Sequence, residues 1–328
     1  MDSQTVAIVI PCYNVKRHIL EVIDSIGPAC QQIFVVDDAC PEQSGAFVEA
    51  NCTDPRVTVL KHAMNQGVGG AVVTGYKAAL EAGADIVVKM DGDGQMDPDE
   101  LPGLIRPLED GTADYTKGNR FHSFYSVRQM PKVRLFGNAV LSFMTKLSSG
   151  YWNLFDPTNG YTAIHREVLS RIELHKLGKR YFFETDMLIM LGDHRAVVTD
   201  VPMEAVYGDE ESGLKISRIA GPFLWGNIRG TIRRMVYSYF FRDFNLASLN
   251  LVFGLLLMAF GGVFGLVKWQ QSIAEGVAAT SGTVMVAVLP IILGFQLVLF
   301  FLSYDVSNTP RQPLQSLSAR RRKRPDQA

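Results

Sequence analysis

The first two-thirds of the chain alternate short apolar runs with longer segments in which apolar and polar residues are mixed. The apolar runs are rich in β-branched residues and lie at 5–10, 33–36, 57–60 and 86–90. Such runs are typical of parallel strands buried on both faces. The mixed segments at 15–26, 65–83 and 99–108 are bounded by Gly or Pro, as helices often are. This alternation predicts an α/β fold, a doubly wound and mostly parallel sheet with helices on both faces.

The same alternation continues to about residue 210. A fifth strand is expected at 113–120, a helix at 133–147 and a last strand at 197–207. The sequence therefore predicts one domain over residues 1–210.

The pattern changes after residue 211. Between 219 and 241, arginines are interleaved with aromatic and aliphatic residues at helical spacing, which favours amphipathic helices in a membrane interface over 211–243. There is no charged residue between Asp243 and Lys268, or between Glu275 and Asp305. Each stretch is as long as the ~20 apolar residues that span a bilayer. We expect a transmembrane hairpin over 244–304, with helices at about 244–267 and 281–303; a buried hairpin of a soluble protein is the alternative.

Charges around these stretches predict the topology. The link 268–275 is nearly neutral, whereas arginines lie before Asp243, at Arg311 and at 320–324. Positive charge favours the cytoplasmic side, so we expect an integral protein of the inner or plasma membrane with both termini and the first domain in the cytoplasm. The segment 305–328 is expected to be a basic, disordered tail resting on anionic lipid. No cleavable signal peptide is expected at the N-terminus, and a two-helix anchor favours a homo-oligomer.

Composition narrows the function classes only slightly. The net charge is -1, and no nucleic-acid partner is expected. The four cysteines, Cys12, Cys30, Cys40 and Cys52, lack zinc-ligand spacing and are expected to be free thiols of a cytosolic domain.

Polar clusters follow four of the predicted strands, and the carboxyl ends of parallel strands share one edge of a sheet. These clusters are Tyr13–Asn14, Asp37–Asp38, Asn65–Gly70 and Asp91–Gln95. Four such clusters in succession predict a nucleotide site. Asp37 or Asp38 can accept hydrogen bonds from a base or a ribose, with a helix N-cap as the alternative. The glycines of 65–70 let backbone approach a ligand at a helix start, although helix–sheet packing also uses such glycines.

The cluster at Asp91–Gln95 suits a metal ion. Gly92 lets Asp91 and Asp93 turn toward one cation, and Mg²⁺ and Mn²⁺ favour oxygen ligands together with substrate phosphates. A solvated Asp-Gly turn is the alternative reading of the pair alone.

Taken in order, these motifs resemble a known family. Ile8–Asn14, Val35–Ala39, Asn65–Gly67 and Asp91–Gln95 follow one another as in family 2 glycosyltransferases of the GT-A fold. Within that family the chain resembles the polyprenol-phosphate (dolichyl- or undecaprenyl-phosphate) glycosyltransferases. The motifs span about two-thirds of the chain, and their joint order is more specific than any one of them.

The resemblance implies roles for the donor side. Asp91, Asp93 and Gln95 would hold Mg²⁺ or Mn²⁺ against the diphosphate of a nucleotide-sugar. Pro11, Tyr13 and Asp38 would line the nucleoside pocket. Together with the other residues at the strand ends, the predicted donor-binding set is Pro11, Tyr13, Asn14, Asp37, Asp38, Asn65, Gly67 and Asp91.

The acceptor side is predicted from the segment that follows. Arg120 ends the fifth strand, and Arg134 and Asn138 lie one turn apart on the next helix. Guanidinium groups grip phosphate in bidentate fashion, although from the residues alone these are ordinary surface arginines. In the family this strand end and helix take the acceptor phosphate, so the resemblance implies that role for Arg120, Arg134 and Asn138, with Asp93, Arg120 and Arg134 as the catalytic residues.

Later residues are expected near the sugar or the diphosphate. Residues 156–161 resemble the family's Asp-Pro-x-x-Gly-Phe turn, which implicates Asp156 and Asn159. An acidic residue near Glu184 or Asp186 is the general base in relatives that glycosylate hydroxyls; the alternative is a pair of N-terminal helix charges. The loop 207–215 departs from the expected Arg-x-x-Gly-Glu-Ser-Lys, because Tyr207 and Gly213 replace Arg and Lys. Lys215 is the candidate for the missing charge.

The resulting prediction is an inverting, metal-dependent hexosyltransferase. It would transfer sugar from a nucleotide-sugar, favouring a UDP-hexose, to a membrane polyprenyl phosphate, favouring undecaprenyl phosphate. The alternatives are a GT-A membrane enzyme that acts on a glycan or lipid hydroxyl, and a catalytically silent scaffold. The scaffold predicts loss of Asp91, Asp93 or Arg120, and all three are present.

Overall fold

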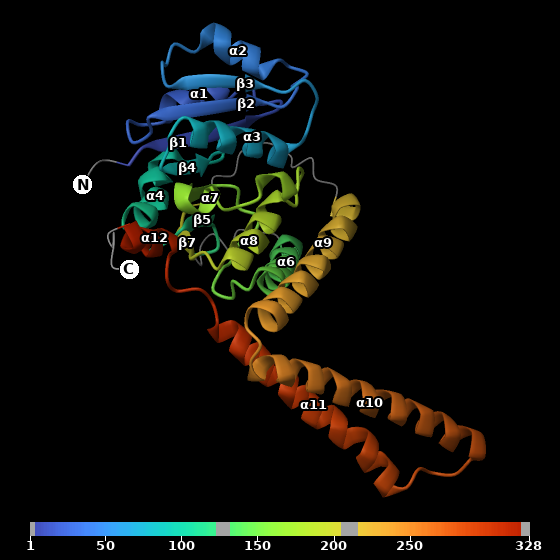
Figure 1. Cartoon of the computed structure of the whole chain (residues 1–328). Coiled ribbons are helices and arrows are strands. Elements are labelled where there is room, and N and C mark those ends of the chain that lie inside the picture. Colours follow the sequence, from blue (N-terminus) through green and yellow to red (C-terminus); the bar gives the residue numbers. More distant parts are fainter. Residues whose placement is uncertain (1–3, 123–131, 205–215, 323–328) are drawn as a thin grey trace. The chain divides into compact units, whose positions relative to one another are not determined.

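The structure is a computed structural model that describes residues 4–122, 132–204 and 216–322. The chain forms two compact units, one of Met1–Thr231 with Pro310–Ala328 and one of Ile232–Thr309. The larger unit holds a single sheet, and the smaller one holds two long apolar helices (Figure 1).

The larger unit is built on a seven-stranded sheet in the order β3-β2-β1-β4-β6-β5-β7. All neighbouring strands run parallel except β6, which is antiparallel to both β4 and β5. The mostly parallel sheet predicted above is confirmed, with one reversed strand that no pattern in the sequence indicated. The strands are β1 Val6–Cys12, β2 Gln32–Asp37, β3 Val57–Lys61, β4 Ile86–Lys89, β5 Tyr115–Asn119, β6 Thr162–His165 and β7 Val198–Pro202.

Helices cover both faces of this sheet, and the alternation within the strands explains why. Ala7 and Val9 of β1 pack into one apolar core with α3 and α8, while Ile8 and Ile10 pack into another with α1 and α4. Because successive side chains of a strand point to opposite faces, a wholly apolar strand needs cover on both. The helices of this unit are α1 Ile19–Ser25, α2 Ser44–Asn51, α3 Val68–Glu81, α4 Leu101–Glu109 (after the 3-10 turn η1, Pro98–Glu100), α6 Lys132–Ser149, α7 Arg166–Leu169, the 3-10 turn η2 Leu174–Lys176 and α8 Phe183–His194.

Some predicted boundaries move. The helix expected from residue 15 begins only at Ile19, because Asn14 has a left-handed backbone (φ 58°) and the residues after it form a turn. The helix expected at 99–108 begins with η1, where the Asp97 carboxylate accepts from the backbone N–H of Asp99 at 2.9 Å. The last strand ends at Pro202.

The segment after residue 305 corrects a prediction. It was expected to be disordered, yet Leu314–Arg322 forms helix α12, which belongs to the larger unit. The buried Asp114 carboxylate accepts from the backbone N–H groups of Leu314 and Gln315 at 2.9 and 3.0 Å. These bonds satisfy donors at the start of α12 and fix it beside β5.

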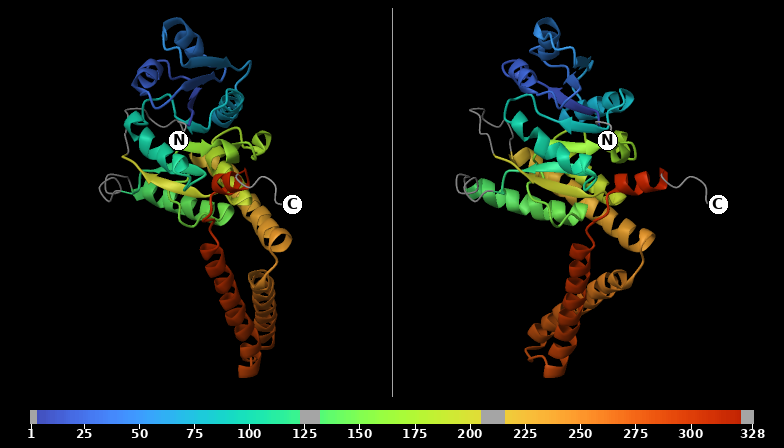
Figure 2. Two further views of the ribbon diagram at one scale, coloured as in Figure 1. Left: turned by 60° about the vertical axis from the view of Figure 1, so that its left-hand side comes forward. Right: turned by 90° about the vertical axis from the view of Figure 1, so that its left-hand side faces the viewer.

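The smaller unit is a helical hairpin of α10 (Leu246–Glu275) and α11 (Ser281–Ser307), preceded by the end of α9 (Ile216–Val236) and the π-helical turn η3 (Tyr237–Arg242). Both long helices are apolar enough to cross a bilayer, with mean hydropathy 2.1 and 2.6, and they run side by side in both views of Figure 2. A Cβ at Gly254 would lie 2.9 Å from the carbonyl oxygen of Gly294, so glycine permits this close packing.

A buried ion pair closes the open end of the hairpin. The Arg234 guanidinium donates two hydrogen bonds to Asp305, at 2.7 and 2.9 Å, and the Tyr239 hydroxyl also bonds this carboxylate. The carboxylate is thus fully paired, as a buried charge requires.

Candidate active site

One edge of the sheet gathers most of the predicted site residues. The carboxyl ends of β1, β2, β4 and β5 lie at this edge because these strands are parallel to one another. Strand β6 runs the opposite way, so the turn before it, residues 156–161, reaches the same edge. We call it the site edge; it brings together Tyr13, Asn14, Asp37, Asp91, Arg120 and the 156–161 turn.

Asp91 and Asp93 follow β4 at the site edge. The Asp91 side chain is 32% exposed, and its Oδ1 accepts from the Lys89 ammonium at 2.8 Å. Within the described parts of the chain, no hydrogen bond reaches Oδ2 of Asp91. Oδ1 of Asp93 accepts from the backbone N–H of Gln95 at 3.0 Å, which tightens the turn.

These donors suit a divalent metal that shares its ligands with a substrate. In the described residues, no group of three or more His, Cys, Asp or Glu side chains could hold a metal alone. Two carboxylates of one strand end are nevertheless the hard oxygen donors that Mg²⁺ and Mn²⁺ use when phosphate oxygens complete the shell. Asp91 and Asp93 would hold such an ion, which would supply Lewis-acid stabilisation of a leaving diphosphate.

A buried lysine lies directly behind Asp91. Lys89 is only 1% exposed, and its ammonium donates to Asp91 and to the carbonyl oxygen of Gly160 (3.2 Å), with Oε1 of Glu184 at 3.4 Å. Burial alone would lower the pKa of Lys89, but Asp91 and Glu184 outweigh it and the pKa is raised. Burial raises the pKa of Glu184, and Lys89 partly offsets this.

Glycine at position 160 makes this cluster possible. A Cβ there would lie 2.4 Å from the Lys89 ammonium nitrogen and 2.8 Å from Oδ2 of Asp91. Any larger residue would have to displace one of these groups. The turn before β6 therefore contributes a close backbone contact to the site.

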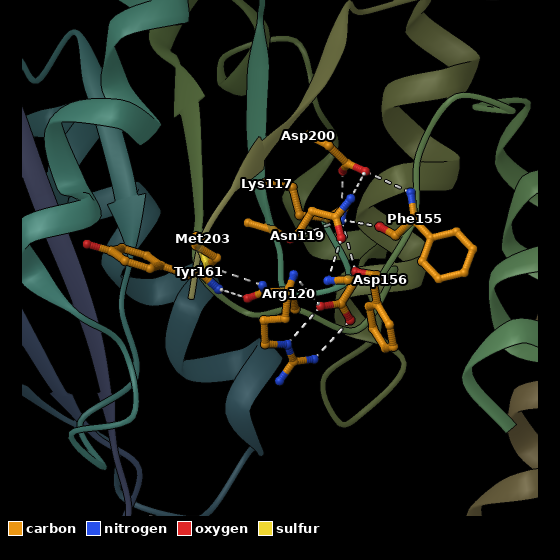
Figure 3. Close-up of polar contacts among 11 residues, drawn as sticks. Lys117, Asn119, Arg120, Phe155, Asp156, Tyr161, Asp200 and Met203 are labelled. Atoms are coloured by element: carbon orange, nitrogen blue, oxygen red, sulfur yellow. Dashed lines mark hydrogen bonds and ion pairs between the residues drawn. The ribbon is translucent and has the colours of Figure 1, made fainter. Parts of the chain in front are cut away.

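Arg120 extends from the end of β5 and pairs with the buried Asp156. Its Nε and one terminal nitrogen donate to the two carboxylate oxygens at 2.7 and 2.9 Å (Figure 3). Arg120 is 30% exposed, whereas Asp156 is 1% exposed and has a left-handed backbone (φ 50°). A bidentate pair fixes the guanidinium plane, so Asp156 orients Arg120 at the site edge.

A second buried lysine holds the turn that carries Asp156. The Lys117 ammonium donates to the carbonyl oxygens of Phe155 and Asp156 and pairs with Asp200 at 2.9 Å. Asp200 also accepts from the backbone N–H of Phe155 (2.7 Å) and the Asn119 amide (3.1 Å), as Figure 3 shows. The position of Arg120 therefore depends on an interior charge network.

Asp37 and Asp38 are buried and accept hydrogen bonds from the protein itself. Asp37 accepts from the backbone N–H groups of Cys40 and Gly45, both at 2.7 Å, near the start of α2. Asp38 accepts from the backbone N–H groups of residues 66 and 67 (2.8 and 2.7 Å), just before α3, and pairs with His62. Asp37 thus satisfies a donor in the first turn of α2, but neither aspartate is the N-cap residue of α2 or α3. A role in donor binding stays a prediction.

The remaining predicted donor residues are close to these loops. Tyr13 is exposed at the end of β1, directly after Pro11 and Cys12, and the backbone N–H of Asn14 donates to the Cys40 sulfur at 3.1 Å. The Asn65 amide donates to the Asp38 carbonyl oxygen at 3.2 Å. Gly67 has φ 87°, and a Cβ there would meet the Lys179 carbonyl oxygen at 2.5 Å.

Other candidates are divided between structure and surface. Asn159 is buried and its Oδ1 accepts from the backbone N–H of Tyr161 at 3.0 Å. Asp186 accepts from the backbone N–H of Gly178 at 2.8 Å. Asn138 is half-buried on α6. The side chain of Arg134, and Tyr207, Gly213 and Lys215, lie outside the described residues.

The sequence analysis assigned no role in the site to Lys89, Lys117 or Asp200. The signal was present for the two lysines, because each is a charged residue inside an otherwise uncharged strand segment, Ile86–Met90 and Tyr115–Asn119. Such a charge must be paired if the strand is buried.

The sheet and its edge have a GT-A-like fold. A solved structure of glucosyl-3-phosphoglycerate synthase from Mycobacterium tuberculosis, in complex with Mn²⁺, UDP and glucosyl-3-phosphoglycerate, has a similar fold, with TM-score 0.53 and 20% identity over 70% of this chain and 80% of that one.

The particular family follows from the sequence. The chain belongs to glycosyl transferase family 2, whose model matches residues 7–173. It is 31% identical to a polyprenol monophosphomannose synthase of Mycolicibacterium smegmatis, over 71% of this chain and 90% of the relative.

Two further relatives are also named for transfer to a lipid phosphate. A UDP-N-acetylglucosamine–dolichyl-phosphate N-acetylglucosaminyltransferase of Methanococcus voltae is 29% identical over 63% of this chain and 88% of the relative. An undecaprenyl-phosphate mannosyltransferase of Micrococcus luteus is 31% identical over 60% of this chain and 82% of the relative.

Proposed function

We propose that this glycosyltransferase transfers a hexose from a UDP-sugar to undecaprenyl phosphate, with inversion at the anomeric carbon and with Mg²⁺ or Mn²⁺. The observation that carries the proposal is that a pair of carboxylates, Asp91 and Asp93, and an oriented arginine, Arg120, lie at one edge of one sheet. The names of the three relatives above support a polyprenyl phosphate as the acceptor class.

The donor side needs groups that hold a nucleoside diphosphate as it leaves. Asp91 and Asp93 supply oxygen donors for the metal. Gly67 is the N-cap of α3, whose N-terminus is near the same edge. Pro11, Tyr13, Asn14, Asp37, Asp38 and Asn65 come from the adjoining strand ends and are the proposed nucleoside contacts.

The acceptor side needs groups that hold a phosphate monoester. Arg120 is fixed by Asp156 and still partly exposed, so its guanidinium can also donate a hydrogen bond to a phosphate oxygen. Arg134 and Asn138 of α6 are the proposed further contacts. A phosphate monoester is largely ionised near neutral pH, so its attack on the sugar needs positioning more than proton removal.

A hydroxyl acceptor is the competing function, and it requires a general base. Glu184 and Asp186 are the two candidates. The Glu184 carboxylate lies 3.4 Å from the buried Lys89 ammonium nitrogen, and Asp186 accepts from the backbone N–H of Gly178 at 2.8 Å. Both carboxylates are thus engaged by groups of the protein itself, and this favours a lipid phosphate.

The surface of the larger unit supports attachment to a membrane. Helix α6 buries Ser142, Thr145 and Ser148 while it exposes Phe136 and Phe143, which is the reverse of a helix on a soluble domain. Ser148 donates to the Asn227 side chain of α9 at 2.8 Å, and α9 exposes Leu224 and Trp225. Such a face suits the lipid interface.

The proposed topology follows from the chain order. The segments before and after the α10–α11 hairpin belong to the same unit, so an even number of spans leaves both termini on its side. We propose that this side is cytoplasmic, in the inner or plasma membrane, and that the protein forms homo-oligomers through the hairpin.

The test uses the detergent-solubilised full chain with Mn²⁺ or Mg²⁺ and a short-chain polyprenyl phosphate. UDP- and GDP-hexoses are offered one at a time, and lipid products are identified by mass spectrometry. A polyprenyl-phosphate hexose from a UDP-sugar is the expected result. Release of nucleoside diphosphate without a glycolipid would refute the acceptor assignment, and a product from GDP-sugars alone would refute the donor.

A further inference from the structure

The Lys89 cluster has a charge balance that the donor site alone does not explain. Lys89 carries one positive charge and is shared by two carboxylates, Asp91 at 2.8 Å and Glu184 at 3.4 Å. If Glu184 were absent, the lysine would cancel the charge of Asp91. With Glu184 present, Lys89, Asp91 and Glu184 together keep one negative charge, so Asp91 remains attractive to a divalent cation.

The cluster also fixes the direction of the Asp91 carboxylate. The Lys89 ammonium also donates a hydrogen bond to the Gly160 carbonyl oxygen at 3.2 Å, and its side chain is too buried to move into solvent. Its hydrogen bond takes one lone pair of Oδ1 of Asp91, whereas in the described residues no hydrogen bond reaches Oδ2, which makes Oδ2 the better placed oxygen for a cation. Residues that orient a metal ligand in this way affect binding almost as strongly as the ligand itself.

We propose that Lys89, Glu184 and the Gly160 carbonyl form a clamp that orients Asp91 and balances its charge for a divalent cation. Glu184 is thus a positioning residue and not a general base. This inference rests on the metal site of the proposed function, and it predicts that Glu184 controls metal affinity although it contacts no metal.

Two variants test the clamp by different routes. Glu184→Gln removes one negative charge while keeping an acceptor oxygen near Lys89. Gly160→Ala keeps every charge but places a methyl group 2.4 Å from the Lys89 nitrogen and 2.8 Å from Oδ2 of Asp91, so it disturbs the clamp and the carboxylate that the clamp orients. Glu173→Gln, at an exposed pair with Lys176, is the control for charge. Gly103→Ala is the control for the added methyl group, because a Cβ there meets only Val201 at 3.8 Å.

The primary readout is Mn²⁺ binding to the full chain. It is measured by electron paramagnetic resonance, once with UDP present and once with GDP present. Both clamp variants are expected to bind Mn²⁺ about 10- to 100-fold more weakly than the wild type, while both controls bind normally. Turnover of Glu184→Gln is expected to recover as Mn²⁺ is raised. Thermal melting identifies a variant that has lost its fold.

Other outcomes separate this inference from the proposed function. If Glu184→Gln binds Mn²⁺ like the wild type yet loses turnover at every Mn²⁺ concentration, the clamp is refuted and Glu184 acts on substrate. Normal Mn²⁺ binding by both variants, or no Mn²⁺ binding by the wild type, refutes it as well. If the variants weaken Mn²⁺ as expected but the wild type makes no glycolipid, the clamp stands and the lipid acceptor is wrong.

Discussion

The two edges of the one sheet use buried charge in opposite ways. At the site edge, Asp91 and Arg120 are each tied to a buried partner and remain partly exposed. At the opposite edge, Asp114 is fully buried, and its oxygens accept from the backbone N–H groups of Val197, Leu314 and Gln315. His165, at the far end of β6, likewise accepts from the backbone N–H of Glu167 at 3.2 Å. A network whose charged groups are all buried and paired stabilises the fold, whereas a network with a partly exposed charged group can also bind a ligand.

The strongest test of this comparison removes a carboxylate that is proposed to bind the metal. Asp93→Ala is expected to lower turnover by on the order of 10³-fold, because the leaving diphosphate loses its electrostatic stabilisation. Its melting temperature should stay near that of the wild type, since Asp93 is at the surface of the site edge. Unchanged turnover with metal and donor would show that the metal is held elsewhere.

The matched test at the opposite edge should move stability instead. Asp114→Asn replaces one acceptor oxygen with a donor that faces backbone N–H groups, and it is expected to cost about 3 kcal/mol of unfolding free energy. Denaturant titration in detergent would measure this, with Asp110→Asn, at an exposed pair with Arg106, as the control. Turnover per folded molecule should be normal; a selective loss of turnover would break the distinction between the edges.

A smaller effect is expected when the carboxylate that orients Arg120 is changed. Asp156→Asn leaves only one good acceptor for Arg120, so its guanidinium is less firmly oriented. The KM for polyprenyl phosphate should rise about 10-fold, as expected for one weakened charged hydrogen bond, while the KM for the donor changes little. A change confined to the donor KM would place Arg120 on the donor side.

The smallest effect concerns pH. Burial lowers the pKa of His165 below its usual 6.5, so as pH falls the unfolded chain takes up the proton before the folded protein does. Stability is therefore lost below about pH 6.5, and the loss levels off once pH passes the lowered pKa. His165→Asn keeps a capping acceptor and should make the unfolding free energy less dependent on pH in this range. An unchanged slope of stability against pH would show that other groups cause the loss of stability.

Local patterns in the sequence predicted the sheet, both apolar helices and the polar strand ends. Those features depend on neighbouring residues, as in the apolar run that ends at Asp91. The reversal of β6, the pairing of Arg120 with Asp156 and the contact of Glu184 with Lys89 could not be predicted. Each joins residues far apart in the chain, and in the case of Glu184 the same local pattern fits a general base, a helix charge or a partner for a buried lysine.

Helix α12 has a consequence for how the protein is made. It follows α10 and α11 in the chain, yet it supplies two of the three backbone donors that the Asp114 carboxylate binds. A growing polypeptide emerges from its N-terminus, so Asp114 meets these partners only after both apolar helices have been synthesised. The hydrogen bonds between Asp114 and α12 can therefore form only late in synthesis, when the α10–α11 hairpin is already complete.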